Sequence, residues 1–231
     1  MSSFEEVVRK ILDRRANIPD TRSLLVGVSG IDGCGKGYFA TQLRAHLALH
    51  GVIPAILNVD GWLNLPHKRF DQNAPAVNFY ENAIRLDQFF GHLVLPLRDR
   101  RSVHLVADFV EETATDYRKH SYDYEDVSVV LVEGIFLFKP QYRKHFDLAI
   151  WIDCSFPTAL ARAIYRAQEG LSPANTIAAY ETIYFPAQRI HLAQDKPREN
   201  ADLIFENDIY AKQPVLHSLR QIRYPTHFTF N

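Results

Sequence analysis

The sequence has little cysteine, no long apolar run and no cluster of basic residues. Two cysteines among 231 residues are too few for a disulfide framework. No apolar run approaches the roughly 18 residues of a membrane span, and the first stretch, MSSFEEVVRKILDRR, is amphipathic and charged, without the apolar core of a signal peptide. The net charge is −1 and no run of five basic residues occurs, which argues against a nucleic acid or a membrane as a partner. We therefore expect a cytoplasmic protein in a reducing environment.

The composition is that of a globular protein with a substantial core, because hydrophobic residues make up 47% and charged residues 23% of the chain. A length of 231 residues suits a single α/β domain. We find no internal repeat, low-complexity segment or linker. The expected organisation is one domain over residues 1–231, with an N-terminal helix at 3–16, a core at about 22–208 and a C-terminal extension at 209–231 that gives no clear signal.

Short apolar runs alternate with amphipathic stretches along the core. Residues 62–80 are polar, aromatic and irregular, and are expected to form a long loop. Strands that alternate with helices predict an α/β fold, in which a mainly parallel sheet is covered by helices on both faces. By periodicity, the expected helices are 3–16, 36–50, 83–97, 156–169 and 173–194, and the expected strands are 23–29, 55–59, 127–132, 147–153 and 201–205, with an edge strand at 103–109.

The glycine-rich stretch after the first strand fits the first seven positions of the phosphate-loop pattern G-x-x-x-x-G-K-[ST]. Its glycines allow successive backbone N–H groups to converge on phosphate oxygens, and the helix that follows points its positive end at the same anion. Lys36 would reach the outer phosphates and is expected to be solvated when the site is empty. The residues expected to bind ATP are Gly30, Ile31, Asp32, Gly33, Cys34, Gly35, Lys36, Gly37 and Tyr38.

Gly37 departs from this pattern, since a Ser or Thr there usually places a hydroxyl on Mg²⁺. The magnesium would then depend on water, on other side chains and on the nucleotide. A second explanation is that Tyr38 or the loop around His67 crowds the position and requires glycine. Cys34, near a helix N-terminus and beside Lys36, has two reasons for a lowered pKa; the alternative is an inert small residue that fills a tight loop.

Two acids follow strands of the expected parallel sheet. Ligands bind beyond the carboxyl ends of such strands. Glu133 ends the apolar strand VVLV and is expected to hold magnesium. Asp60 is expected to accept the proton of a substrate hydroxyl or to hold magnesium. A turn role stays open for both acids. Asp153 also ends a strand, but a capping or turn role is expected there.

The order and spacing of seven segments resemble the uridine kinase-like branch of the P-loop kinases, which includes uridine-cytidine kinases, pantothenate kinase and phosphoribulokinase. The resemblance covers about residues 22–208 and implies a three-layer P-loop NTPase fold, ATP and Mg²⁺ as cofactors, and a small-molecule acceptor. The segments are GVSGIDGCGK (27–36), NVDGW (58–62), NFYENAIRLDQF (78–89), VVLVEGIFLF (129–138), FDLAIWIDC (146–154), PAQRIHL (186–192) and KPRENADLIFEN (196–207).

The resemblance also implies roles for individual side chains. Asp60 corresponds to the catalytic base, and Arg162 and Arg166, four residues apart on one helix face, correspond to lid arginines that act with Lys36 on the transferring phosphate. Ala167 stands where the family often has Asp. Candidates for binding the acceptor are Asp60, Tyr80, Asp108 and Arg118, with His67, Lys68 and Arg69 as weaker ones.

Two functions fit these observations. The first is an ATP-dependent kinase that transfers the γ-phosphate to a hydroxyl of a nucleoside- or sugar-like acceptor. The second is a non-catalytic nucleotide-binding protein derived from such a kinase, in which Gly37 reflects lost chemistry. The sequence leaves open whether the protein forms a homo-oligomer.

Overall fold

A five-stranded parallel sheet forms the centre of the protein in a computed structural model that describes residues 2–167 and 170–208. Its strands occur in the order β2 (Ala55–Asn58), β5 (Val129–Gly134), β1 (Leu24–Gly30), β6 (Leu148–Asp153) and β7 (Leu203–Glu206). Every residue of β1 and β5 is buried, as apolar strands in the interior of a parallel sheet require. Over the described residues, no helix combines the length and the apolar character needed to cross a membrane.

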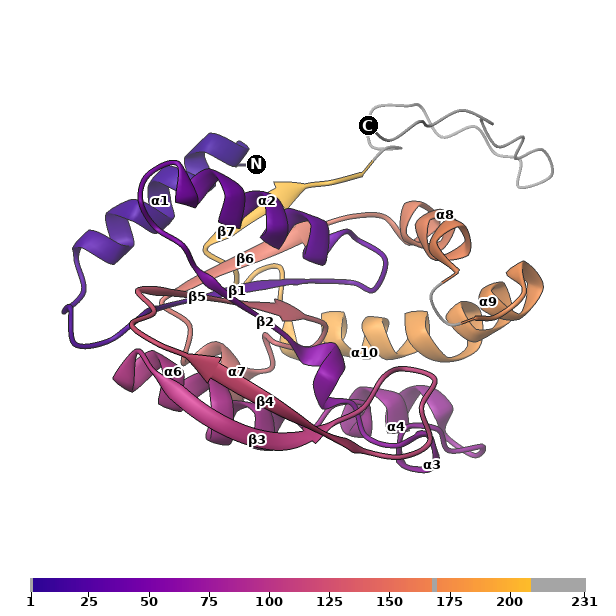
Figure 1. Ribbon diagram of the computed structural model, residues 1–231. Coiled ribbons are helices and arrows are strands. Elements are labelled where there is room, and N and C mark those ends of the chain that lie inside the picture. Colours follow the sequence, from indigo (N-terminus) through magenta and orange to yellow (C-terminus); the bar gives the residue numbers. More distant parts are fainter. Residues whose placement is uncertain (1, 168–169, 209–231) are drawn as a thin grey trace.

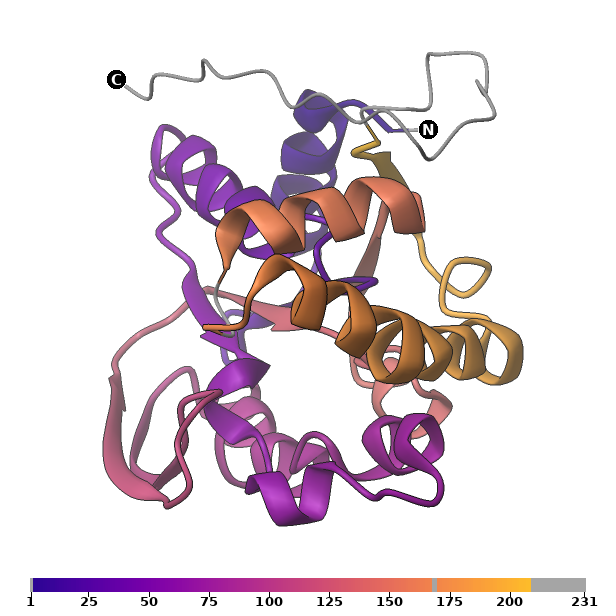
Figure 2. The same ribbon diagram turned by 90° about the vertical axis from the view of Figure 1, so that its right-hand side faces the viewer.

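Helices cover both faces of this sheet (Figure 1). Helices α1 (Phe4–Ala16) and α2 (Lys36–Ala48) lie on one face, and α10 (Phe185–Asp195), α4 (Pro75–Asn82) and α6 (Leu95–Arg100) lie on the other. The predicted three-layer α/β fold is therefore confirmed. Helix α8 (Phe156–Arg166) and the helix that contains α9 (Pro173–Ala179) and α10 run side by side across the face shown in Figure 2.

Two helices contain a π-helical turn directly before a proline-containing turn. Helix α5 (Leu86–Phe89) continues through a π turn at Phe90–Val94 into α6, and α9 continues through Tyr180–Tyr184 into α10. Pro96 and Pro186 occupy the start of α6 and α10. Proline removes one N–H donor and crowds the carbonyl four residues before it, and the wider π turn accommodates both effects without ending the helix.

The structure corrects three sequence-based expectations. Residues 62–80 are not one long loop: a 3₁₀ turn at Val59–Trp62 is followed by helix α3 (Pro66–Arg69) and by α4. The strand at 103–109 is not an edge of the main sheet, because β3 (Val103–Phe109) pairs antiparallel with β4 (Arg118–Tyr124) as a separate hairpin. Strand β4 was not predicted, since its sequence RKHSYDY is polar. The C-terminal extension at 209–231 lies outside the described residues.

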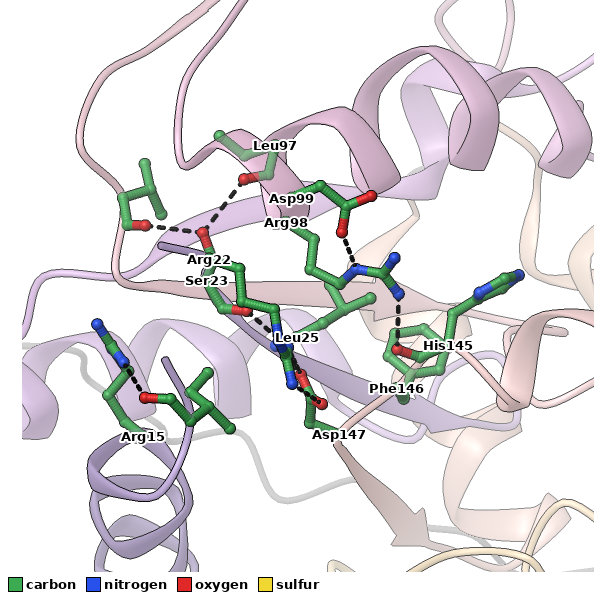
Figure 3. A network of polar contacts seen from close by, with 12 residues as sticks. Arg15, Arg22, Ser23, Leu25, Leu97, Arg98, Asp99, His145, Phe146 and Asp147 are labelled. Atoms are coloured by element: carbon green, nitrogen blue, oxygen red, sulfur yellow. Dashed lines mark hydrogen bonds and ion pairs between the residues drawn. The ribbon is translucent and has the colours of Figure 1, made fainter. Parts of the chain in front are cut away.

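A network of polar contacts anchors the first strand of the core (Figure 3). Asp147 accepts two hydrogen bonds from the Arg22 guanidinium, at 2.7 and 2.9 Å, and one from the backbone N–H of Leu25, at 2.9 Å. The Ser23 hydroxyl lies between the carbonyl oxygens of Val127, at 2.7 Å, and Leu97, at 3.2 Å. These contacts fix where β1 begins relative to β5 and β6, and so where its other end delivers the phosphate loop.

We expect Asp147→Ala to lower the free energy of unfolding by about 2 kcal/mol, because it removes a bidentate ion pair and leaves the Leu25 N–H without its acceptor. Asp99→Ala is the control: Asp99 is half exposed and forms an ion pair with its neighbour Arg98, so its removal should cost under about 0.5 kcal/mol. Urea denaturation of the two variants measures the difference. Equal midpoints would show that the Asp147 network contributes no more than an ordinary surface pair.

Candidate functional site

The phosphate loop joins β1 to α2 and has a backbone that only glycine adopts without strain. Gly33 has φ +76° and Gly35 has φ +95°. A Cβ on Gly33 would lie 2.6 Å from the Ala159 carbonyl oxygen, and one on Gly35 would lie 2.7 Å from Nδ2 of Asn207. The loop is therefore packed closely against α8 and against the segment after β7. The Asn207 amide and the Arg162 guanidinium both donate to the Cys34 carbonyl, at 2.7 and 3.1 Å.

Lys36 is buried inside this loop, which contradicts the expectation that it is solvated when the site is empty. Its side-chain Nζ donates to the carbonyl oxygen of Ile31 at 3.0 Å. Burial disfavours the charged ammonium, but the electrostatic contributions of Cys34, Asp32 and Glu133 exceed this effect and raise the pKa of Lys36. The lysine thus remains a cation, held where the loop would receive an anion.

Cys34 is also fully buried, and the expected lowering of its pKa is wrong. Desolvation by burial raises the pKa of the thiol and outweighs the attraction of Lys36. The side chain fills a tight space, since a Cβ on Gly30 would lie 2.6 Å from Sγ of Cys34. The alternative reading of Cys34, an inert small residue inside the loop, agrees with this packing.

Glu133 lies beside the first turn of α2, at the end of β5. The nearest atom to a Cβ built on Gly37 is Oε1 of Glu133, at 3.5 Å. Glu133 is buried, yet within residues 2–167 and 170–208 its carboxylate has no hydrogen-bond or ion-pair partner. Burial and repulsion by Asp60 raise the pKa of Glu133 to about 7, against the attraction of Lys36 and Arg166. A buried acid without a protein partner fits the magnesium site that the sequence predicts.

Asp60 lies in the 3₁₀ turn that follows β2, and its charge acts on Glu133. The register of the sheet explains why, because Asn58 of β2 pairs with Glu133 of β5. Asp60 is open to solvent within a concave part of the surface. Partial desolvation by the surrounding protein, together with repulsion by Asp32, raises the pKa of Asp60.

The two predicted lid arginines both face the phosphate loop from α8. Arg162 contacts the Cys34 carbonyl, and Nη2 of Arg166 lies 3.9 Å from Oδ1 of Asp32. Asp32 also accepts a hydrogen bond of 2.7 Å from the hydroxyl of Tyr180. Sequence reasoning missed Tyr180 and Asn207, since a buried aromatic in a helix and an amide after a strand have many roles. Asp153 does not cap α8 as expected: Ser155 is the cap, and Asp153 pairs with Arg198.

The predicted acceptor-binding residues do not converge on one cavity. Asp60 lines a cavity of about 480 Å³ between β2 and the β3–β4 hairpin. Asp108 lines a different cavity, of about 630 Å³, with Arg85 and Lys139. The Tyr80 hydroxyl donates to Asp195 at 2.6 Å. Arg118 pairs with Glu111, which lines the Asp60 cavity, and Lys68 lines the cavity of Asp108. Arg69 is buried and donates to the carbonyl of Glu112.

No protein-family model matches the chain, but several solved structures share its fold. One is described as a possible uridine kinase from Bacillus stearothermophilus, with a TM-score of 0.69, 20% identity, and coverage of 87% of this chain and 96% of that one. Another, described as a proposed fructose transport system kinase from Silicibacter sp. TM1040, has a TM-score of 0.65, 17% identity, and coverage of 89% and 100%. A third is a D-glycerate 3-kinase from Cryptococcus neoformans, with a TM-score of 0.57, 12% identity, and coverage of 80% of this chain and 87% of that one. The chain therefore has the fold of the P-loop kinases, as its resemblance to the uridine kinase-like branch implied.

The space around Gly37 generates a testable prediction. Apart from the neighbouring residues of its own helix, only Glu133 lies within 4 Å of an added Cβ, so the His67 loop does not crowd the position. We expect Gly37→Ser to keep the fold and to raise the free energy of unfolding by up to about 0.5 kcal/mol, since Ser is the better helix residue. The new hydroxyl beside Glu133 should also tighten magnesium binding.

Gly35→Ser is the matched control, because its positive φ and the contact with Asn207 make any side chain unfavourable there. It should lower the free energy of unfolding by more than about 1 kcal/mol. Thermal and urea denaturation, with and without magnesium, compare the two variants. A Gly37→Ser variant that is as unstable as Gly35→Ser would contradict the geometry described above.

Proposed function

We propose that the protein is an ATP-dependent small-molecule kinase that transfers the γ-phosphate to a hydroxyl of a nucleoside- or sugar-like acceptor. The observation that carries the proposal is the position of Glu133: a buried carboxylate that has no partner among the described residues, and whose pKa is under the joint influence of Asp60, Lys36 and Arg166. Phosphates, a divalent cation and a hydroxyl nucleophile are the ligands that this set of charges suits.

The phosphate-loop amides and Lys36 would bind the nucleotide phosphates. For this, Nζ of Lys36 exchanges the Ile31 carbonyl for a phosphate oxygen, a stronger acceptor because it is charged. Arg162 and Arg166 on α8 are near enough to the loop to neutralise charge on the γ-phosphoryl group. Glu133 would hold Mg²⁺, which when bound offsets the negative charge of the phosphates.

Asp60 would act as the base. The acceptor hydroxyl gives its proton to the Asp60 carboxylate as its oxygen forms a bond to the γ-phosphorus. The bond from the γ-phosphorus to the bridging oxygen breaks, and its electron pair leaves with ADP. The raised pKa of Asp60 is closer to the working pH than that of an ordinary aspartate. This suits a group that must first take up a proton and then release it.

Gly37 favours the second candidate, a nucleotide-binding protein without turnover, because position 37 of α2 has no hydroxyl to offer to magnesium. A screen of hydroxyl-bearing acceptors that detects ADP release separates the two functions. Turnover on any acceptor supports the kinase. Calorimetric ATP binding without ADP release on the whole panel would favour the non-catalytic protein.

Asp60→Asn tests the base directly. We expect it to reduce turnover by about 10²–10⁴-fold, the usual contribution of general acid–base catalysis. ATP affinity should change little, since the phosphates bind the loop. Lys36→Ala is the contrasting variant and should weaken ATP binding strongly in calorimetry. Normal turnover of a folded Asp60→Asn variant would remove Asp60 from the mechanism.

The raised pKa of Glu133 predicts how magnesium binding depends on pH. Only the ionised carboxylate binds the cation, so a group with a pKa of about 7 is mostly protonated at pH 6 and mostly ionised at pH 8. The magnesium concentration at half-saturation, corrected for ATP ionisation, should therefore fall about tenfold over this range. Glu133→Gln should bind magnesium weakly without this pH dependence.

Asp153→Asn is the control for this titration, because Asp153 also ends a strand but pairs with Arg198. It should keep the pH dependence of the unmodified protein. A flat profile in the unmodified protein, or an unchanged one in Glu133→Gln, would show that Glu133 does not bind the metal.

A further inference from the structure

A second cavity lies apart from the one beside Asp60. It has a volume of about 630 Å³ and is lined by parts of α3, α4, α5, the hairpin and α7 (Pro140–Arg143). Among the described residues, the two cavities share no lining residue. Consecutive strand residues face opposite ways, so Phe109 of β3 lines the Asp60 cavity while Asp108 lines this one. Neither Asp60 nor the phosphate loop contributes to its wall, so its ligand is not the acceptor of the proposed reaction.

Lys139 is a buried cation in the wall of this cavity, with only 8% of its surface exposed. Its Nζ donates to the Tyr80 carbonyl oxygen at 2.7 Å and lies 3.9 Å from the centre of the Tyr80 ring. Within residues 2–167 and 170–208, no carboxylate forms an ion pair with it. An ammonium group has three N–H donors, and this one gives a single hydrogen bond to a neutral acceptor.

The surroundings compensate the charge of Lys139 only in part. Asp195, Glu81 and Asp87 attract it at longer range, but desolvation outweighs this attraction and lowers the pKa of Lys139. A buried cation without an ion pair costs free energy, and an anion inside the cavity would reduce that cost. Lys139 is thus the counterpart of Glu133, a buried charged group that has no ion-pair partner among the described residues.

Two of the three acids in the wall are already engaged. Asp108 forms an ion pair of 2.7 Å with Lys119, and Asp87 accepts a hydrogen bond of 2.7 Å from the Tyr142 hydroxyl. The third acid, Glu81, is exposed, and its carboxylate makes neither a hydrogen bond nor an ion pair with the described residues. Glu81 is therefore the acid of the wall that would oppose a bound anion most.

The two other cations of the wall differ in the same way. Arg85 is engaged, since its guanidinium donates to the carbonyl oxygens of Leu63, at 3.2 Å, and Asp108, at 2.7 Å. Lys68 on α3 is exposed, and its ammonium has no hydrogen bond or ion pair within the part of the chain that the structure describes. Two lysine ammonium groups thus remain available against one carboxylate, and this balance favours a negatively charged ligand.

We propose that this cavity is a second ligand site, which binds a small oxyanion, either a carboxylate or a phosphate ester, with Lys139 as its main partner and Lys68 as the second. A lysine pairs with either group as a point charge, and hydrogen bonds between charged groups are stronger than those between neutral ones. The volume is within the range of small-molecule sites. The proposal does not depend on the kinase function, because it requires neither Asp60 nor the phosphate loop.

Calorimetric titration at constant ionic strength tests the site, with inorganic phosphate and succinate as the two probes. Lys36→Ala is the background for every titration, because it removes the cation of the phosphate loop, which would also attract anions. We expect at least one probe to bind in this background. Tighter binding of phosphate would identify the ligand as a phosphate ester, and tighter binding of succinate as a carboxylate. No binding of either probe at millimolar concentration would overturn the proposal.

Two variants in this background test Lys139. Lys139→Met keeps the length of the side chain but removes its charge, and should weaken binding of the probe by about tenfold or more. Lys144→Met is the matched control, because Lys144 follows α7 directly, is exposed and does not line the cavity. It should leave the affinity unchanged. Equal affinities in these two variants would show that Lys139 does not bind the anion.

Two exposed positions complete the test. If Lys139→Met does not fold, Lys68→Met replaces it, since a change on the exposed face of α3 leaves the core intact. It should weaken binding severalfold. Glu81→Gln should have the opposite effect and tighten binding, because it removes a negative charge from the wall. Unchanged affinity in both of these variants would place the bound anion outside this cavity.

Discussion

Val28, Glu133 and Asn58 stand side by side on β1, β5 and β2, because the three strands are parallel and pair in one fixed register. The chain therefore leaves all three strands at the same edge of the sheet. The phosphate loop begins there after β1, and Asp60 follows there after β2. A shift of one residue in any of these strands would turn the following side chain to the other face. At the opposite edge, the Ser23 hydroxyl helps to hold β1 beside β5 through the Val127 carbonyl, and the ion pair of Arg22 with Asp147 holds β1 beside β6.

This register places Glu133 between Val28 of β1 and Asn58 of β2. Glu133 is buried and its carboxylate lacks a protein partner among the described residues, a condition that costs free energy. Protonation of Glu133 reduces this cost because it removes the buried charge, and the raised pKa shows that the protonated form is favoured. A divalent cation beside Gly37 would stabilise the ionised form instead. A buried acid with a pKa shifted in this way is a candidate functional group.

Local signals explain why much of the core could be predicted from the sequence. The apolar strands, the glycine loop and the acids after the strands each occupy a few consecutive residues, and the parallel arrangement follows from their order. The predictions failed where contacts between residues far apart in the sequence determine the environment of a side chain or the formation of a strand. Burial outweighs the neighbouring lysine and raises the pKa of Cys34. A hydrogen bond to the Ile31 carbonyl keeps the Lys36 side chain inside the loop. The polar strand β4 is stabilised by pairing with β3 and by its aromatic face, neither of which a local pattern reveals.

The π turn at Tyr180–Tyr184 divides one long helix into two α-helical segments, α9 and α10. Its hydrogen bonds are wider and weaker than those of the α-helical segments on either side, so bending is concentrated there. Helix α10 packs against α4, whereas α9 packs against α8, the helix that carries Arg162 and Arg166. In a continuous α-helix without this π turn, any displacement of α8 and α9 would also move α10. A joint at Tyr180–Tyr184 would let α8 and α9 change position over the phosphate loop while α10 keeps its packing.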